Sequence, residues 1–354
     1  MGFLPKKSIT RLTFSLASKW CWDYTENMSD SIIKVENLVK RFGTLTAVDS
    51  ISFTVPAGEI FGFLGPNGAG KTTTISILCT LLKPTSGTAI LNGYDVVRQQ
   101  NHVRQSIGLV FQDPSLDDRL TGMQNMRFHA MVYNVPSSVR EQRIAEVLKM
   151  VELWDRRNSE VRTYSGGMKR RLEIARGLLH RPKVLFLDEP TLGLDPQTRN
   201  RIWEYVLELR QREGTTVFMT THYMDEAEKA DRIAIIDNGK LVAVDAPENL
   251  KKLVGKDIVS VRTGDNARAI EEIKLRYQIE ARRNSNGITF DVASGEEFLP
   301  TFIKEFGTKI LSVSLHRPSL DDVFLKLTGR EIRPEDVGDG MKAMMQAHVR
   351  RMRR

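Results

Sequence analysis

The chain has 354 residues, of which 41% are hydrophobic and 27% charged, and its formal net charge is +8. This length allows two domains with a sizeable core, and the composition is typical of a soluble globular protein. No stretch approaches the ~18 uncharged apolar residues of a transmembrane helix, and the only two cysteines, Cys21 and Cys79, argue against a disulfide framework or a cysteine zinc site.

Residues 1–27 are not expected to belong to the fold. Lys6 and Lys7 resemble the start of a signal peptide, but the stretch that follows alternates polar and apolar residues and includes Arg11. We interpret this segment as an N-terminal extension that is disordered or is not the native start, since Met28 directly precedes an alternating predicted strand from Ile32 onward.

A glycine-rich loop lies between a predicted strand and a predicted helix. Residues 60–64 form a short apolar run, and residues 73–78 carry apolar side chains at helical spacing. The segment between them matches the pattern G-x-x-x-x-G-K-[ST], which requires this context. The predicted nucleotide-binding residues of the loop are Gly65, Pro66, Asn67, Gly68, Ala69, Gly70, Lys71, Thr72 and Thr73.

The residue types of this loop suit a polyphosphate. Glycines allow backbone N–H groups to approach a polyanion, and the N-terminus of the following helix adds a partial positive charge. In such loops the lysine reaches the β- and γ-phosphates and the hydroxyl residue holds Mg²⁺. Lys71 and Thr72 therefore predict a site for a nucleoside triphosphate and magnesium.

Helical patterning interrupts the strands in the middle of the chain. The apolar strand at 107–111 delivers Gln112 at its end, and apolar residues then recur at helical spacing from Thr121 to about Asn158. We predict an inserted helical subdomain at about 113–163 within an α/β domain that covers residues 28–254.

Polar residues follow two later apolar strands. Asp188 and Glu189 come directly after residues 184–187, a continuous apolar run that is typical of a central parallel strand. His222 follows the apolar strand at 215–220 in the same way. Because α/β folds bind ligands at the carboxyl ends of their strands, all three side chains are candidate site residues.

Residues 255–333 are predicted to form a small α+β accessory domain with no catalytic constellation. Its elements follow the order β-α-β-β-α-β plus a helix, for which a ferredoxin-like fold is one arrangement. The expected strands are 257–263, 277–283, 288–292 and 309–315, and the expected helices are 266–276, 296–306 and 319–328. We interpret this domain as a dimerisation or regulatory module. Residues 334–354 form a basic tail, either solvated or in contact with acidic headgroups.

Taken together, the motifs resemble the nucleotide-binding subunit of an ABC transporter over residues 32 to about 250. They occur in the order phosphate loop, Gln112, Ser165-Gly166-Gly167, Asp188-Glu189, Leu194-Asp195 and His222. The stretch at 318–330 resembles the end of the daunorubicin-resistance type of drug-exporter ATPase. The resemblance implies an α/β P-loop NTPase fold of the ABC type.

The resemblance also implies a role for each candidate residue. Glu189 is the general base for the attacking water, and Lys71 and His222 contact the phosphates. Thr72, Asp188 and Gln112 are the Mg²⁺ residues, and Gln112 also senses the membrane partner. Phe42 stacks on adenine, although an ordinary aromatic at a strand end is the competing interpretation.

A further set of residues is implied to act on the ATP of a second copy of the chain in a head-to-tail dimer. These residues are Ser165, Gly166, Gly167 and Asp195. Tyr164 and Met168 stand where Leu and Gln are commoner in the family, but the Ser-Gly-Gly sequence is intact, so we infer no loss of activity.

The implied function is that of an ATPase subunit at the cytoplasmic face of the membrane, driving export of a drug-like, antibiotic or lipid-like compound through a separate transmembrane permease. No nucleic-acid partner is expected. The alternative is a soluble ABC-type ATPase of DNA repair or translation. Repair proteins carry a long coiled coil where this chain has about 90 residues without heptads, and translation proteins carry two phosphate loops. A nucleotide sensor without turnover is a third possibility, against which Glu189 argues.

Overall fold

The computed structural model describes residues 31–112, 115–284 and 287–329. The predicted N-terminal extension (1–27) and basic tail (334–354) therefore lie outside the described residues. Among the helices within the described ranges, none combines the length and the apolar character needed to cross a bilayer.

A six-stranded sheet forms the centre of a larger α/β part, with the strand order β10-β9-β3-β8-β7-β6. Its strands are β3 (Ile60–Leu64), β6 (Ile107–Val110), β7 (Val184–Asp188), β8 (Thr216–Thr221), β9 (Arg232–Asp237) and β10 (Lys240–Asp245). All pairs are parallel except the β9–β10 hairpin. Every residue of β3, β7 and β8 is buried, which explains their continuous apolar sequences. The carboxyl ends of these strands consequently meet at one edge.

An antiparallel sheet and helix α1 (Lys71–Leu78) pack on one face of this sheet. The antiparallel strands are β1 (Ser31–Phe42), β2 (Leu45–Pro56), β4 (Ser86–Leu91) and β5 (Tyr94–Asp95), in the order β2-β1-β4-β5. Ile75 of α1 shares one apolar core with Phe53 of β2, Phe61 of β3 and Phe218 of β8. Seven side chains of α1 are buried between these layers, which fixes the start of the helix beside the end of β3.

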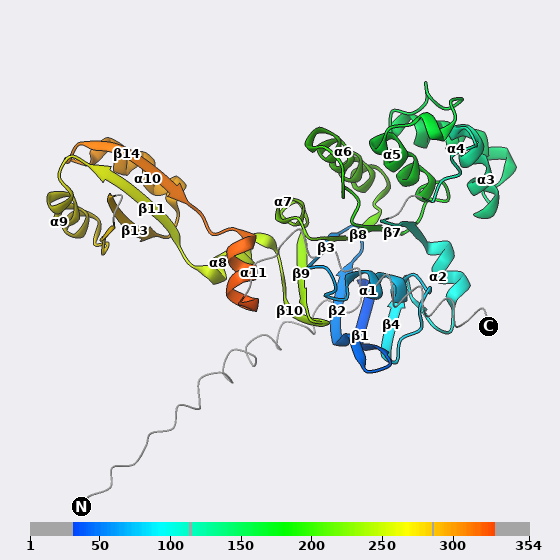
Figure 1. Ribbon diagram of the computed structural model, residues 1–354, viewed down its shortest axis with the longest axis horizontal. Coiled ribbons are helices and arrows are strands. Elements are labelled where there is room, and N and C mark those ends of the chain that lie inside the picture. Colours follow the sequence, from blue (N-terminus) through cyan, green and yellow to red (C-terminus); the bar gives the residue numbers. More distant parts are fainter. Residues whose placement is uncertain (1–30, 113–114, 285–286, 330–354) are drawn as a thin grey trace, which may run out of the picture.

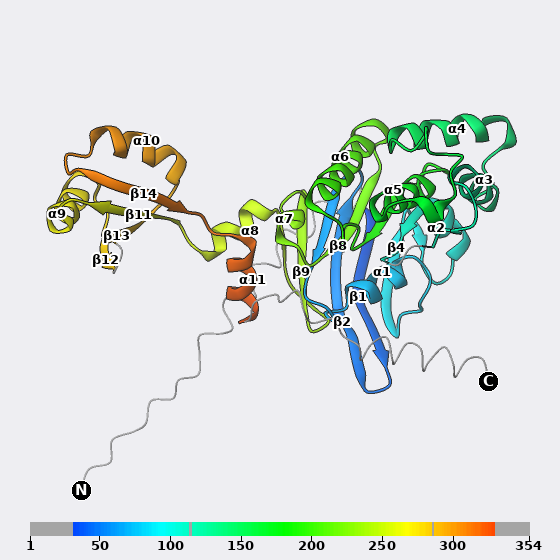
Figure 2. The same cartoon turned by 45° about the horizontal axis from the view of Figure 1, so that its top comes forward.

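Helices cover the opposite face and extend beyond it. They are α3 (Gly122–Val132), α4 (Ser137–Met150), α5 (Gly166–Gly177), α6 (Pro196–Glu213) and the short α7 (Met224–Ala227), with α2 (Gln100–Ser106) and a 3-10 turn at Val161–Thr163 between strands and helices. Met126 of α3, Ile144 of α4 and Leu172 of α5 share a core with Leu185 and Leu187 of β7. Both views place α3, α4 and α5 at the end of the molecule away from the C-terminal sheet (Figure 1, Figure 2). Helices α3 and α4 thus occupy the segment at about 113–163 where an inserted helical subdomain was expected.

The C-terminal sheet is antiparallel, with the order β12-β13-β11-β14. Its elements are β11 (Asp257–Thr263), α9 (Asn266–Tyr277), β12 (Arg282–Asn284), β13 (Gly287–Val292), α10 (Gly295–Glu305) and β14 (Ile310–His316). This split β-α-β arrangement is the ferredoxin-like one, built on its own core around Val259 and Phe302. The strand expected at 277–283 begins only at Arg282, since residues 278–281 form neither helix nor strand. Tyr277 belongs to α9, and its ring packs on Phe302 at a centroid distance of 5.6 Å.

The last helix, α11 (Leu320–Thr328), packs on the larger part and not on the C-terminal sheet. Leu320 and Phe324 lie in the same core as Leu250 of α8 (Pro247–Val254). Lys326 Nζ donates to the backbone oxygen of Leu253 at 2.6 Å. The two helices form the joint between the two parts (Figure 1). The expected boundary between residues 254 and 255 separates the larger part from the C-terminal sheet along the chain. Helix α11 comes after this boundary but packs on the larger part.

Candidate functional site

The glycine-rich loop joins the buried end of β3 to the first turn of α1. A Cβ at Gly65 would lie 2.3 Å from the backbone oxygen of Ile236, and one at Gly70 would lie 2.4 Å from that of Ala47. Gly70 also has a φ of +106°, which disfavours other residues. At Gly68 a Cβ would meet nothing within 4 Å. Gly65 and Gly70 are therefore required because the loop packs closely against the backbone of other segments. This reason adds to the one predicted from the sequence, which is the approach of a polyanion to the loop.

Lys71 is held at the mouth of this loop. Its ammonium donates to the backbone oxygens of Gly65 at 2.7 Å and Pro66 at 3.2 Å, and it lies 3.3 Å from Oε1 of Glu189. Burial lowers the pKa of Lys71, while the Glu189 carboxylate acts in the opposite direction. The ammonium thus has oxygen acceptors that phosphate oxygens could replace.

Asp188 ends β7 next to the hydroxyl of Thr72. Asp188 Oδ1 accepts hydrogen bonds from Thr220 Oγ1 at 2.5 Å and from Thr72 Oγ1 at 3.4 Å. Burial raises the pKa of Asp188, and the hydrogen bond from Thr220 partly offsets this effect. A carboxylate and a hydroxyl side by side are oxygen ligands of the type that Mg²⁺ prefers.

Glu189 lies between two basic side chains. Its Oε1 is 3.3 Å from Lys71 Nζ and 3.4 Å from His222 Nδ1, and its backbone N–H donates to Thr220 Oγ1 at 3.0 Å. Burial acts to raise the pKa of Glu189, but His222 and Lys71 together bring that pKa below its ordinary value. A carboxylate that stays ionised at neutral pH can accept a proton from water.

His222 and Gln112 follow the ends of β8 and β6, the strands on either side of β7. His222 is 8% exposed, and its Nδ1 makes no hydrogen bond to any residue that the structure describes, despite its proximity to Glu189. Gln112 is exposed just after β6, whose Val110 pairs with Leu187 of the parallel strand β7. The fold therefore places Gln112 at the same edge as Asp188 and Glu189.

Phe42 lies at the last position of β1, where it pairs with Leu45 across the hairpin. Its ring is half-buried, with Lys40 Nζ at 4.9 Å from the ring centroid. Ala47, further along β2, approaches Gly70 of the loop. This hairpin therefore runs alongside the loop, and stacking of Phe42 on adenine stays a prediction.

The residues expected to act on a second copy cap two adjacent helices. Ser165 Oγ accepts from Met168 N at 3.2 Å at the start of α5, and Asp195 Oδ1 accepts from Thr198 N at 3.0 Å at the start of α6. A Cβ at Gly167 would lie 2.6 Å from Cγ2 of Thr198, so the two helix starts pack closely. Ser165, Gly166 and Asp195 are exposed. Within the described residues, no hydrogen bond or ion pair joins them to the loop of Lys71.

Two residues of the site were missed by the sequence analysis. Thr220 bonds both Asp188 and Glu189, and its only signal is a polar residue near the end of an apolar strand. Arg170 is 6% exposed and binds backbone oxygens on both sides of Glu189. A charged residue one turn into a helix gives no signal of burial, because arginine side chains are mostly exposed.

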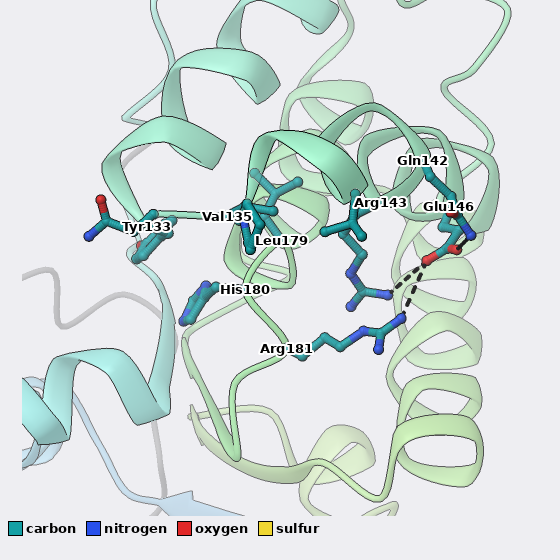
Figure 3. A pocket seen from close by; sticks show the side chains of 11 residues that line it. Tyr133, Val135, Gln142, Arg143, Glu146, Leu179, His180 and Arg181 are labelled. Carbon is teal, nitrogen blue, oxygen red and sulfur yellow. Dashed lines mark hydrogen bonds and ion pairs between the residues drawn. The ribbon is translucent and has the colours of Figure 1, made fainter.

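A separate hollow of about 290 Å³ lies between the end of α3, α4 and the segment after α5 (Figure 3). Tyr133 and His180 stack at one side of it, with ring centroids 4.1 Å apart, and Arg143 and Arg181 both face Glu146 at the other. None of the predicted site residues lines this hollow. It is therefore not part of the candidate nucleotide site.

Comparison with known proteins identifies two family matches. A family model described as "ABC transporter" matches residues 48–192, and one described as "ATP-binding protein DrrA1-3-like, C-terminal domain" matches residues 246–328. The second match begins just before α8 and ends with α11, which agrees with the packing of these two helices against each other.

Curated relatives cover most of the chain. The daunorubicin resistance ATP-binding protein DrrA2 of Streptomyces coeruleorubidus is 39% identical over 311 residues, which are 85% of this chain and 96% of the relative. The linearmycin resistance ATP-binding protein LnrL of Bacillus subtilis is 36% identical, covering 85% of this chain and all of the relative (100%). The Nod factor export ATP-binding protein I of Ralstonia nicotianae is 37% identical, covering 86% and 96%.

Solved structures match the larger part of the chain. The cassette MJ0796, a dimer in a post-hydrolysis state bound to ADP and Pi, superposes with a TM-score of 0.56 at 28% identity, covering 60% of this chain and 98% of that one. CbiO1 from Clostridium perfringens, part of the ABC transporter complex cbiONQ, superposes with a TM-score of 0.59 at 28% identity, covering 70% and 96%.

Proposed function

Because this chain belongs to the family of ABC transporter ATP-binding proteins that includes the daunorubicin-resistance subunits, we propose that it drives export of a drug-like, antibiotic or lipid-like compound through a separate membrane subunit. The chain is an ATPase subunit of an exporter. Nothing in the comparisons supports the alternative of a DNA-repair or translation ATPase.

The observation that carries this proposal is the cluster of Lys71, Glu189 and His222 at one edge of the sheet. In the proposed reaction Glu189 accepts the proton of the attacking water, Lys71 binds the phosphates, and His222 contacts the γ-phosphate. Because Glu189 lies within 3.4 Å of both basic groups, all three side chains can act on the same reacting atoms.

Magnesium fits the residues next to this cluster. Thr72 and Asp188 would hold the ion, with Gln112 contributing from the neighbouring strand end. Mg²⁺ is held by one or two carboxylates together with substrate phosphates and water, so no cluster of several acidic side chains is needed. When bound, the ion would neutralise charge on the transferring phosphoryl group.

We propose that two copies pair head to tail and share their sites. Helix α5 has 12 residues, and Ser165 with Gly166 and Gly167 forms its exposed N-terminus. The free N–H groups and dipole of a helix N-terminus favour an anion, and the γ-phosphate bound at Lys71 of the other copy supplies one. The dimeric state of MJ0796 supports this arrangement.

A mixing experiment tests the shared sites. Lys71→Ala damages the phosphate side of both sites in a homodimer, and Ser165→Arg damages the other side of both. In a mixed dimer one site carries both substitutions and the other carries neither. We expect ATPase activity of the mixture above the sum of the separate preparations. Full activity of Ser165→Arg at concentrations where the protein is monomeric would contradict the shared-site mechanism.

A surface on α3 supports a membrane partner. Phe128, Met131 and Val132 are 53%, 53% and 57% exposed, and their spacing places them on one side of the helix. Clustered exposed apolar side chains commonly mark protein interfaces. We propose that the permease docks on this side of α3, which would hold the subunit at the cytoplasmic face of the membrane.

Phe128→Asp is expected to weaken membrane attachment roughly 10–100-fold, since burying one phenylalanine contributes about 1.5–3 kcal/mol. The measurement is co-sedimentation with membranes of the cells that produce this protein. Leu275→Asp is the matched control, because Leu275 is 83% exposed on α9, in the C-terminal sheet domain. Equal sedimentation of Phe128→Asp and the control would contradict docking on α3.

A further inference from the structure

We propose that Arg170 is a positioning residue for ATP hydrolysis: it fixes the backbone on both sides of Glu189 and beside Gln112, and it thereby ties these two residues to helix α5. This inference rests on the proposed role of Glu189 as the base. Arg170 lies one turn into α5, after Ser165-Gly166-Gly167.

The guanidinium of Arg170 spans the ends of two strands. Its Nε donates to the backbone oxygen of Pro190 at 2.6 Å, and its Nη2 donates to that of Asp188 at 3.1 Å. Its Nη1 donates to the backbone oxygen of Phe111 and to Oε2 of Glu173, the latter at 3.3 Å. The planar fork of an arginine side chain can satisfy several acceptors in fixed directions. One side chain therefore links the backbone just after β6 to the end of β7 and the residue after Glu189.

The backbone of Glu189 needs such support. Its φ of 45° lies in the left-handed region, which a residue with a Cβ adopts only at a conformational penalty. Arg170 binds the carbonyl oxygens immediately before and after it, and Thr220 accepts its N–H. These three bonds hold the conformation in which the Glu189 carboxylate lies beside Lys71 and His222.

Two further residues on the same side of α5 hold the segment after Gln112. Glu173 Oε1 accepts from the backbone N–H of Ser115 at 2.8 Å, and Arg176 Nη1 donates to the backbone oxygen of Ser115 at 3.0 Å. Arg170, Glu173 and Arg176 recur at intervals of three residues and are 6%, 0% and 6% exposed. Both flanks of Gln112 are thus attached to α5.

The consequence concerns communication between the two proposed sites of a dimer. Helix α5 begins at Ser165, which is proposed to meet the ATP of the other copy. The same helix carries the groups that hold Gln112 and Glu189 of its own chain. If α5 shifts when Ser165 engages the partner's ATP, it would therefore move Glu189 and Gln112 of its own chain together. These two residues act on the ATP bound at Lys71 of that same chain.

The test is Arg170→Lys, which keeps a positive charge beside Glu173 but cannot bind three carbonyl oxygens in one plane. Because misplacement of a reacting group by about 1 Å can lower a rate by about 10²-fold, we expect kcat to fall roughly 10–100-fold. The Kd for ATP, measured by titration without hydrolysis, should be unchanged, since Arg170 does not contact the loop of Lys71. An unchanged kcat would overturn the proposal.

Arg143→Lys is the matched control. Arg143 is 7% exposed, binds both oxygens of Glu213 at 2.8 and 3.0 Å, and donates to the backbone oxygen of Leu178 at 2.8 Å. It is therefore an equally buried and charge-paired arginine, and among the described residues its polar partners are Glu146, Glu213 and Leu178, not the ends of β6 or β7. We expect this variant to lose comparable thermal stability but to keep its kcat. An equal fall in kcat for both variants would make the role of Arg170 merely structural and overturn the proposal.

A double-mutant cycle separates positioning from general damage. In a Glu189→Gln background, Arg170→Lys should produce little further loss of kcat, because the group that it positions is already removed. Additive losses would overturn the proposal.

Glu173→Gln is the variant to use if Arg170→Lys does not fold. It keeps the side-chain volume and removes the charge partner of Arg170, so we expect the same fall in kcat. An unchanged kcat would again overturn the proposal. A wild type without ATP hydrolysis would overturn the proposed function itself, which distinguishes the two failures.

Discussion

Replacing Glu189 by glutamine is expected to lower the rate of ATP hydrolysis by about 10²–10⁴-fold, the usual contribution of a general base, while ATP still binds. An amide of the same shape cannot accept a proton from water. Lys71, which carries the phosphate contact in the proposed mechanism, keeps its hydrogen bonds to the backbone oxygens of Gly65 and Pro66. The variant should therefore accumulate as an ATP-bound dimer.

Size-exclusion chromatography with ATP and magnesium, together with a phosphate-release assay, measures both parts of this expectation. Glu146→Gln provides a matched control, because Glu146 lies beside the separate hollow of about 290 Å³ and contacts Arg143 and Arg181 (Figure 3). The control should hydrolyse ATP like the wild type. Wild-type turnover in Glu189→Gln would place the base elsewhere.

Lys71→Ala is expected to weaken ATP binding roughly 10–100-fold and to abolish turnover. A charge-assisted hydrogen bond contributes about 1.5–3 kcal/mol, and the phosphate oxygens lose at least one such bond. The substitution also leaves Glu189, which is 9% exposed, without one of its two basic neighbours. The loss should thus appear in the Kd as well as in kcat, unlike that of Glu189→Gln.

Nucleotide titration of Lys71→Ala against a Lys149→Ala control measures this effect. Lys149 lies on α4, with its ammonium over the ring of Trp154, and has no contact with the loop. The control should bind ATP with wild-type affinity. Unchanged ATP affinity together with unchanged turnover in Lys71→Ala would remove Lys71 from the site.

The family could be recognised, and the candidate site residues could be predicted, from the sequence because both depend on local patterns. The loop from Gly65 to Thr72 has a fixed spacing between a strand and a helix. Asp188 and Glu189 follow a continuous apolar run, which indicates a buried parallel strand and therefore a ligand-binding strand end. The order of the remaining motifs then indicated the ABC family, which the relatives confirm.

The sequence alone thus determined the strand–loop–helix context of the phosphate loop, the position of the acidic pair and the order of elements in the C-terminal sheet, because turn residues and apolar periodicity act over a few neighbouring residues. Only the tertiary structure decided that Arg170 binds the ends of β6 and β7, and that α11 packs on α8 instead of the C-terminal sheet. The physical reason is that a buried charge or an apolar helix face must find partners, but the pattern that demands burial does not specify which distant segment supplies them.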